Sequence, residues 1–196
     1  MNKQILFLGY CRKETSLISS LEKKGCTVFH SSEKISWENK YDLIICFGYR
    51  HIIKKEQINK SSCPIINLHV SYLPWNKGAH PNFWSHYEGT PSGVTIHEID
   101  TGIDTGNIIF QKYVYFKDTE NTFALTYSRL ILEIEDLFNK NIDLILSKTW
   151  VSKPQRQAGT THKIKDLPPS FKGWNSNIKN EIARLNEVLQ DKMINQ

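Results

Sequence analysis

Short apolar runs alternate with amphipathic stretches along the first 70 residues of the chain. Continuous apolar runs that end at turn residues predict buried strands, and four of them lie at residues 4–9, 26–30, 41–48 and 63–70. Between the first two, apolar residues at Leu17, Ile18 and Leu21 precede Gly25, which predicts a helix ending at that glycine. Residues 51–60 predict a short helical link. This alternation predicts a Rossmann-like α/β fold, with a doubly wound, mostly parallel sheet and helices on both faces.

The second half of the chain continues with helices and strands. The pattern predicts a helix at residues 80–89, strands at 93–99 and 106–116, and a long helix at 119–146. Pro81 falls in the first turn of the first of these helices, where proline is well tolerated. Thr119 or Asn121 is the expected cap of the long helix.

A segment that contains proline and glycine follows Trp150 and leads to an amphipathic helix at residues 176–191. We therefore expect a main domain over residues 1–150. Residues 151–196 are expected to form a short C-terminal extension, made of a loop or hairpin and a helix.

Composition narrows the class of protein. The chain has 196 residues with 39% hydrophobic and 23% charged residues, which suits one globular domain. Its first apolar run is too short for a membrane span or a signal peptide, so we expect a cytoplasmic protein without membrane attachment. The four cysteines form no C-x-x-C pair and indicate neither zinc nor a disulfide framework. The net charge of +5 suits a small anionic ligand and is weak evidence for nucleic acid.

Two polar side chains end the fourth apolar run. Asn67 and His69 lie two positions apart on the predicted strand, so their side chains share one face. The carboxyl end of a strand in an open α/β sheet is the usual ligand crevice. For an isolated N-x-H the simpler interpretation is a polar strand end that hydrogen-bonds its own turn.

The heptad "DTGIDTG" at residues 100–106 adds a second polar cluster. Aspartate and glycine are turn residues, so a tight structural turn is one interpretation. A calcium loop is another, but the third, sixth and twelfth positions hold Gly102, Thr105 and Gln111 instead of the required ligands and glycine. Calcium is therefore rejected.

Taken together, "NLH", "SYLP" and "GVTIHEIDTGIDTG" resemble the 10-formyltetrahydrofolate-dependent formyltransferase family. The likeness covers roughly residues 1–150 and is sharpest across residues 67–106. The loop "SYLPWNKGAHPNFW" is most similar to the branch that formylates nucleotide-linked amino sugars. The resemblance implies the formyltransferase fold, with residues 1–150 as the catalytic domain.

The family's catalytic Asn, His and Asp map onto Asn67, His69 and Asp104. Formyl transfer to an amine passes through a tetrahedral intermediate, and an amide N–H from Asn67 can stabilise its oxyanion. His69 can accept the proton that the amine loses. Asp104 can orient the imidazole and stabilise its charged form. This chemistry needs no metal.

The resemblance also implies where the folate lies. It places Phe47, Gly48 and Tyr49, at the end of the third strand, near the pterin. The backbone around Ile99 and Asp100 is expected to bind the pterin edge.

Four residues are expected to bind the other substrate. Tyr10 and Arg12 lie at the first strand-to-helix junction, where helix N-terminal amides bind anions, although a solvated helix start is an equally good interpretation. Trp75 can face a sugar or base, and Lys77 can pair with a diphosphate.

The implied function is formyl transfer from 10-formyltetrahydrofolate to a dTDP-linked amino-dideoxyhexose. We expect dTDP-4-amino-4,6-dideoxyglucose as the acceptor, lipopolysaccharide O-antigen biosynthesis as the pathway, and a homodimer. Alternatives are a phosphoribosylglycinamide formyltransferase of purine synthesis, an initiator-tRNA formyltransferase, and a non-catalytic folate or sugar-nucleotide binding module. The loop after His69 argues against the first, and the short sequence after Trp150 argues against the second.

Overall fold

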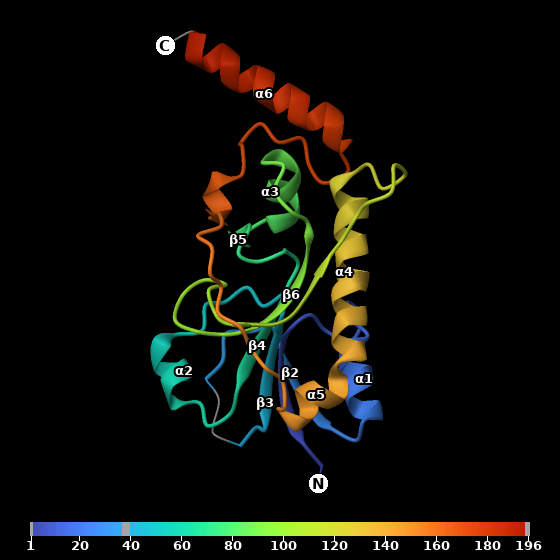
Figure 1. Ribbon diagram of the computed structural model, residues 1–196, viewed down its shortest axis with the longest axis vertical. Helices are drawn as coiled ribbons and strands as arrows, with labels where there is room; N and C mark the ends of the chain where they lie inside the picture. The colour runs from blue at the N-terminus through green and yellow to red at the C-terminus, as the bar shows by residue number, and fades with distance from the viewer. Residues whose placement is uncertain (1, 37–39, 195–196) are drawn as a thin grey trace.

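A computed structural model of the chain describes residues 2–36 and 40–194, and its centre is a six-stranded mixed sheet (Figure 1). The strands are β1 (Gln4–Gly9), β2 (Thr27–Ser31), β3 (Leu43–Phe47), β4 (Ile65–His69), β6 (Gly93–Glu98) and β7 (Ile108–Tyr113). They are ordered β2-β1-β3-β4-β6-β7. The first four strands in this order are parallel, and β6 runs antiparallel to both of its neighbours, β4 and β7. A second sheet pairs β5 (Lys77–Gly78) with β8 (Thr161–His162).

Helices cover both faces of the large sheet. α1 (Leu17–Lys23), α4 (Phe123–Lys140) and α5 (Ile142–Ser147) cover one face, and α2 (Lys55–Lys60) lies on the other. The remaining helices, α3 (Pro81–Tyr87) and α6 (Ile178–Ile194), contribute to a separate apolar cluster. Because side chains alternate along a strand, Phe7 packs with α1, α4 and α5, whereas Leu6 and Leu8 pack on the side of α2. The mostly parallel, doubly wound sheet with helices on both faces is confirmed.

The long helical pattern at residues 119–146 forms two helices instead of one. α4 begins after Thr122, whose hydroxyl accepts from the N–H of Leu125 at 3.2 Å, so the predicted caps at Thr119 and Asn121 were wrong. α4 ends at Asn141, whose side-chain amide donates to the carbonyl of Leu137 at 2.8 Å. Asparagine competes in this way for backbone groups and so interrupts the helix. α5 then starts in a new direction.

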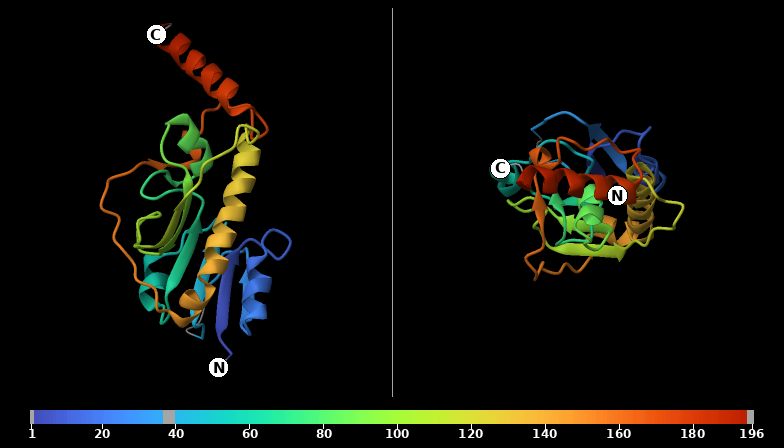
Figure 2. Two further views of the ribbon diagram at one scale, coloured as in Figure 1. Left: turned by 45° about the vertical axis from the view of Figure 1, so that its right-hand side comes forward. Right: turned by 90° about the horizontal axis from the view of Figure 1, so that it is seen from above.

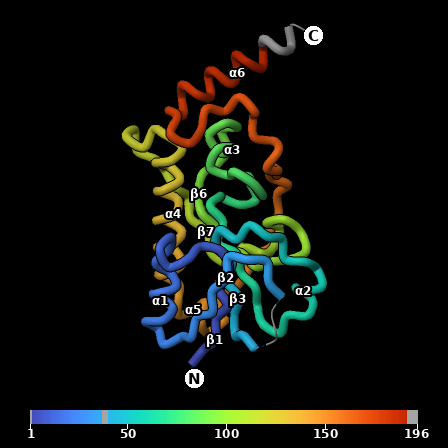
Figure 3. Tube along the Cα trace, turned by 180° about the vertical axis from the view of Figure 1, so that it is seen from behind, coloured from blue at the N-terminus to red at the C-terminus, as the bar shows by residue number. Residues whose placement is uncertain are grey.

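The segment after Trp150 returns along the molecule and packs against its main part (Figure 2). The backbone of Lys153 pairs with that of Ile108, and β8 pairs with β5 rather than with a strand of the extension itself. A separate apolar cluster joins both parts of the chain; its fully buried members are Phe83, Trp84, Phe123 and Leu185. α6 extends from the end of the molecule opposite the N-terminus (Figures 1 and 3).

No helix within residues 2–36 and 40–194 has both the length and the apolar character needed to cross a bilayer.

Candidate active site

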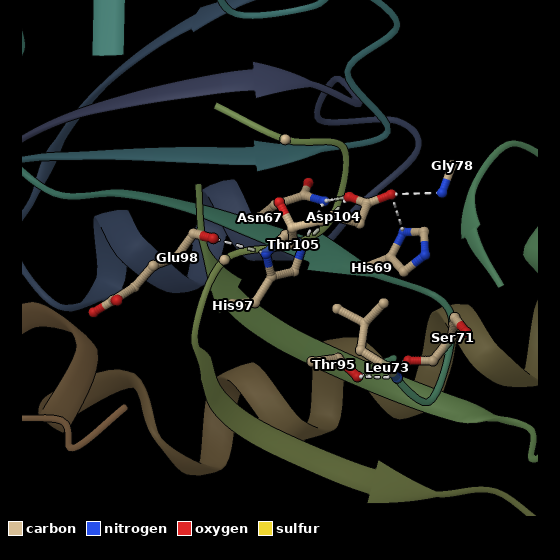
Figure 4. Close-up of polar contacts among 12 residues, drawn as sticks. Asn67, His69, Ser71, Leu73, Gly78, Thr95, His97, Glu98, Asp104 and Thr105 are labelled. Atoms are coloured by element: carbon tan, nitrogen blue, oxygen red, sulfur yellow. Dashed lines mark hydrogen bonds and ion pairs between the residues drawn. The ribbon is translucent and has the colours of Figure 1, made fainter. Parts of the chain in front are cut away.

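Four polar side chains meet at the carboxyl end of β4 (Figure 4). Asn67 and His69 point to the same face of β4, and His97 on β6 lies directly opposite Asn67 in the antiparallel pair. Asp104 comes from the loop after β6. Its Oδ1 lies 3.2 Å from Nδ2 of Asn67, and its Oδ2 lies 3.7 Å from Nδ1 of His69. The structure thus brings together the three residues predicted to be catalytic.

The heptad at residues 100–106 forms a tight loop, closed by its own side chains. The carboxylate of Asp100 accepts from the N–H of Gly102 at 3.0 Å and from the hydroxyl of Thr105 at 2.6 Å. A Cβ at Gly106 would lie 1.7 Å from the carbonyl oxygen of Glu98, so only glycine fits there. Asp100 therefore builds the loop that presents Asp104.

Asp104 is held in an uncommon backbone conformation. Its φ of 51° is in the left-handed region, which aspartate tolerates better than most residues. The side-chain amide of Gln155 donates to the carbonyls of Asp104 and Gly106, at 2.8 Å each. The N–H of Gly78 donates to Oδ2 of Asp104 at 2.8 Å. Two distant segments thus fix the carboxylate beside His69.

Burial and the neighbouring groups set the protonation states of the site. Burial would raise the pKa of Asp104, but His69, His97 and the N–H of Gly78 together lower that pKa below its ordinary value. Burial lowers the pKa of His69 by more than the Asp104 carboxylate raises it. At neutral pH the site therefore holds an ionised Asp104 beside a neutral His69, the state that a general base requires.

The side chain of Asn67 faces other protein groups. Nδ1 of His97 lies 2.8 Å from the carbonyl oxygen of Glu98, and its Nε2 lies 3.1 Å from Nδ2 of Asn67 and 3.4 Å from Oδ1 of Asp104. The same Nδ2 also donates to Asp104. An N–H of Asn67 reaches an oxyanion only by sharing or leaving one of these bonds. The oxyanion role of Asn67 stays a prediction.

A pocket of about 700 Å³ opens over this cluster. Strand ends, α3, the start of α4 and one residue of the C-terminal segment line it. The lining residues include Tyr10, Phe47, Gly48, Tyr49, Arg50, Asn67, His69, Gly78, His80, Pro81, Asn82, Phe83, Asp104, Phe123, Ala124, Tyr127, Ser128 and Trp174. Its volume is in the range of ordinary ligand pockets.

The expected cofactor residues divide into two groups. Phe47, Gly48 and Tyr49 line the pocket. Ile99 instead packs against the apolar cluster on the α2 side, and its N–H donates to the carbonyl of Ile65 at 2.8 Å. Asp100 closes its own loop. The structure therefore does not bring Ile99 and Asp100 to the pocket wall.

The two residues expected at the first strand-to-helix junction also separate. Tyr10 lines the pocket, with its hydroxyl 2.5 Å from that of Tyr127. The guanidinium of Arg12 forms two 2.5 Å hydrogen bonds to the carboxylate of Glu22 on α1. Arg12 is thus already paired and lies outside the pocket lining.

Neither Trp75 nor Lys77 belongs to the pocket lining. Lys77 is 8% exposed, and its ammonium donates to the carbonyl of Ala158 at 3.0 Å. Trp75 is half-buried, and its carbonyl accepts from the hydroxyl of Ser71 at 2.5 Å. The loop instead contributes backbone groups to the site: the N–H of Gly78 and the carbonyl of Asn76, which lies 3.2 Å from Nε2 of His69. Trp75 and Lys77 were predicted from their place in the loop after His69 and from their side-chain chemistry, neither of which reveals the partners that they find in the fold.

Sequence reasoning missed several residues of the site. His97 was not among the predicted site residues, although its place on β6 puts it opposite Asn67 in the antiparallel pair. Arg50 directly follows a predicted cofactor residue and lines the pocket. His80, Tyr127 and Trp174 come from elements whose positions the sequence does not reveal.

The described residues contain no group of three or more His, Cys, Asp or Glu side chains suited to hold a metal ion.

Comparison with known sequences agrees with this geometry. The sequence model of the family described as "Formyl transferase" matches residues 30–135. The chain is 29% identical over 128 residues to a dTDP-4-amino-4,6-dideoxyglucose formyltransferase of Mycobacterium bovis, covering 65% of this chain and 53% of the relative. It is 32% identical over 122 residues to a methionyl-tRNA formyltransferase of Geotalea daltonii, covering 62% of this chain and 39% of the relative. The chain thus spans about half the length, or less, of these curated relatives.

Solved structures extend the likeness. The formyltransferase PseJ from Anoxybacillus kamchatkensis, in complex with UDP-4,6-dideoxy-4-formamido-L-AltNAc and tetrahydrofolate, is 41% identical with a TM-score of 0.82, covering 90% of this chain and 96% of that chain. A 4-N formyltransferase from Francisella tularensis is 25% identical with a TM-score of 0.71, covering 84% and 77%. The chain belongs to the formyl transferase family.

Proposed function

We propose that this chain transfers the formyl group of 10-formyltetrahydrofolate to the amine of a nucleotide-linked amino sugar. The observation that carries the proposal is the cluster of Asn67, His69 and Asp104 in an open pocket. Its charge state matches what amine formylation needs, a neutral imidazole supported by a carboxylate.

In the proposed reaction, His69 carries one proton from the sugar amine to the folate. The sugar amine attacks the formyl carbon, and His69 takes the proton that the nitrogen must lose. Asp104 stabilises the resulting imidazolium at 3.7 Å. As the tetrahedral intermediate collapses, the bond from the formyl carbon to N10 of the folate breaks and His69 returns its proton to that nitrogen. A new amide bond remains on the sugar.

The pocket offers a wall and a positive charge to the substrates. Phe47, Gly48 and Tyr49 supply the wall proposed for the pterin. Arg50 adjoins them as an exposed cation, suited to an anionic group of either ligand.

The amine is proposed to sit on carbon 4 of a 4,6-dideoxyhexose. The Anoxybacillus complex contains a UDP-linked 4-formamido sugar, and the Mycobacterium bovis relative is named for a dTDP-linked 4-amino sugar. Both have a pyrimidine diphosphate and a nitrogen at carbon 4. dTDP-4-amino-4,6-dideoxyglucose therefore remains a candidate beside a UDP-linked sugar. Use of the product in O-antigen assembly remains a proposal, as does the homodimer, which light scattering tests.

The test is a panel of acceptors incubated with the chain and 10-formyltetrahydrofolate, with products detected by mass spectrometry. The panel contains UDP- and dTDP-linked 4-amino sugars, a dTDP-linked 3-amino sugar, glycinamide ribonucleotide and methionyl-tRNA. We expect formylation of a 4-amino sugar nucleotide. Formylation of the ribonucleotide or of the tRNA, with no transfer to any sugar, would overturn the proposal. Binding of folate without transfer to any acceptor would favour a binding module.

A further inference from the structure

One wall of the pocket is formed by the C-terminal segment rather than by the strand ends. Trp174 lines the pocket together with His80 and Pro81, at the start of α3, and Phe123 and Ala124, at the start of α4. Figure 1 shows α3 and the C-terminal segment above the carboxyl ends of β3 and β4. The walls proposed for the pterin and the wall around Trp174 thus come from different parts of the fold.

The indole of Trp174 is exposed but firmly held. It is 42% exposed, a large fraction for a tryptophan that is packed on two sides. The ring of Phe171 meets it edge-on at 4.9 Å between centroids, and the ring of His80 lies against it at 5.3 Å with a 40° tilt. The backbone carbonyl of Trp174 accepts from the N–H of Ala124 at 2.8 Å. The ring is therefore fixed in place before a ligand arrives, which lowers the entropy lost on binding.

The polar groups beside the indole suit a neutral, hydroxyl-bearing ligand. Burial lowers the pKa of His80, so its imidazole is neutral at pH 7 and has one donor and one acceptor nitrogen. Asn82 is 3% exposed and donates to the carbonyl of Phe123 at 2.9 Å, but its Oδ1 has no partner within the described chain. Buried polar atoms are rarely left unpaired in folded proteins. A flat apolar face edged by neutral polar groups fits a ring with hydroxyl or amide substituents.

We propose that Trp174, backed by His80, is the stacking wall for the acceptor and determines affinity for the nucleotide-linked sugar. The inference rests on the proposed function. One of two groups of the acceptor lies on the indole: the pyrimidine base or the C–H face of the dideoxyhexose. The ring substituents lie toward His80. The pterin is proposed to lie at a different wall, Phe47–Tyr49, so tetrahydrofolate is expected to bind independently of the indole.

The experiment is calorimetric binding to the whole chain, with Trp174→Ala, Trp174→Phe and Tyr115→Ala compared with the native protein. Tyr115 is the control because it is 84% exposed and lies outside the pocket lining. The ligands are tetrahydrofolate, UDP alone and a UDP-linked 4-amino-4,6-dideoxyhexose. Trp174→Ala is expected to raise the Kd of the sugar nucleotide about tenfold, the effect of one lost stacking partner, and to leave the Kd of tetrahydrofolate unchanged.

The variants separate stacking from loss of fold. Trp174→Phe should restore most of the affinity, and Tyr115→Ala should bind like the native protein. A tenfold loss with UDP alone assigns the indole to the base, and a loss seen only with the sugar nucleotide assigns it to the hexose. An unchanged Kd for the sugar nucleotide in Trp174→Ala, or a loss confined to tetrahydrofolate, overturns the inference. Formyl transfer by the native chain, measured separately, shows whether the proposed function itself stands.

Discussion

Asp104 is the residue on which the electrostatics of the site depend. Its carboxylate contacts His69, His97 and the N–H of Gly78, and these neighbours outweigh the cost of burial and keep it ionised. A neutral His69 beside a fixed carboxylate gains a proton without creating an unpaired buried charge. In the proposed mechanism the residue thus supports a proton cycle on His69, which is 8% exposed.

The pH dependence of turnover follows from His69. Burial lowers the pKa of this histidine below its ordinary value of 6.5. The base is neutral above the folded pKa and protonated below it, so kcat/KM should fall on the acid side with a midpoint under pH 6.5. A pH-rate profile measures this midpoint. An acid limb centred above pH 6.5 would contradict the assignment of His69 as the base.

Asp104→Asn should move that acid limb. The Asp104 carboxylate raises the pKa of His69, so its removal leaves burial less opposed and shifts the midpoint further toward acid. Asparagine tolerates the left-handed backbone at this position, and its side-chain oxygen can still accept from Gly78. The profile of the variant, compared with that of the native enzyme, tests the coupling. An unchanged midpoint would show that the carboxylate does not act on His69.

The sequence predicted those site residues whose relative positions are determined by their short separation along the chain. Asn67 and His69 share a strand face at any register, and the heptad places Asp104 in a glycine-bounded loop. The contacts of long cationic side chains could not be predicted in this way. Arg12 pairs with Glu22 and Lys77 with the carbonyl of Ala158, and no local pattern indicates such tertiary partners.

Among the helices, α3 carries a buried histidine without a full set of partners. His86 packs against Phe116 and Phe123, and its Nε2 is buried with no hydrogen-bond partner in the described part of the chain. Burial lowers its pKa to about 4. Between about pH 4 and pH 6.5 the imidazole of His86 is therefore mostly neutral in the folded protein and mostly protonated in the unfolded chain.

His86→Phe should reduce the acid sensitivity of the fold. Because the folded pKa is depressed, the stability tied to a neutral His86 is present above pH 6.5 and is lost as pH falls toward about 4. The loss amounts to at most about 3 kcal/mol over that window. Phenylalanine does not titrate and suits the aromatic surroundings. Thermal melting at pH 7 and pH 4.5 measures the effect; an equal drop in Tm for both proteins would contradict it.

The elements themselves were largely predictable because apolar runs dictate strands and periodic apolar faces dictate helices. The break between α4 and α5 was not, since apolar residues continue in helical spacing through Ile142 and Ile145. The side chain of Asn141 decides the break by bonding the carbonyl of Leu137, a local competition that periodicity does not show.

For the molecule as a whole, the C-terminal segment is part of the site. It pairs β8 with β5, places Gln155 on the carbonyls of Asp104 and Gly106, and supplies Trp174 to the pocket. These contacts join residues far apart in the sequence, which is why the sequence predicted only an extension of loop and helix. The loop that carries Asp104 is therefore stabilised from outside the core sheet.

Gln155→Ala tests this long-range support. Losing two 2.8 Å hydrogen bonds frees the loop that holds Asp104 in its left-handed conformation. Misplacement of the carboxylate should lower kcat roughly tenfold, with little change in ligand affinity, because Gln155 is not part of the pocket lining. Gln190→Ala, on the exposed face of α6, is the matched control. A kcat equal to that of the control would show that the loop needs no such support.

The central claim is that Asn67, His69 and Asp104 formylate the amine of a sugar nucleotide, and its most direct test is a rate measurement. Native protein and Asp104→Asn are mixed with 10-formyltetrahydrofolate and saturating UDP- or dTDP-linked 4-amino-4,6-dideoxyhexose, and the formylated sugar is followed by mass spectrometry. We predict one formyl group per sugar from the native protein. The folded variant should bind tetrahydrofolate normally but transfer about a hundredfold more slowly. Near-native transfer by the variant, or no transfer to any amino sugar by a native protein that binds both ligands, would contradict the account.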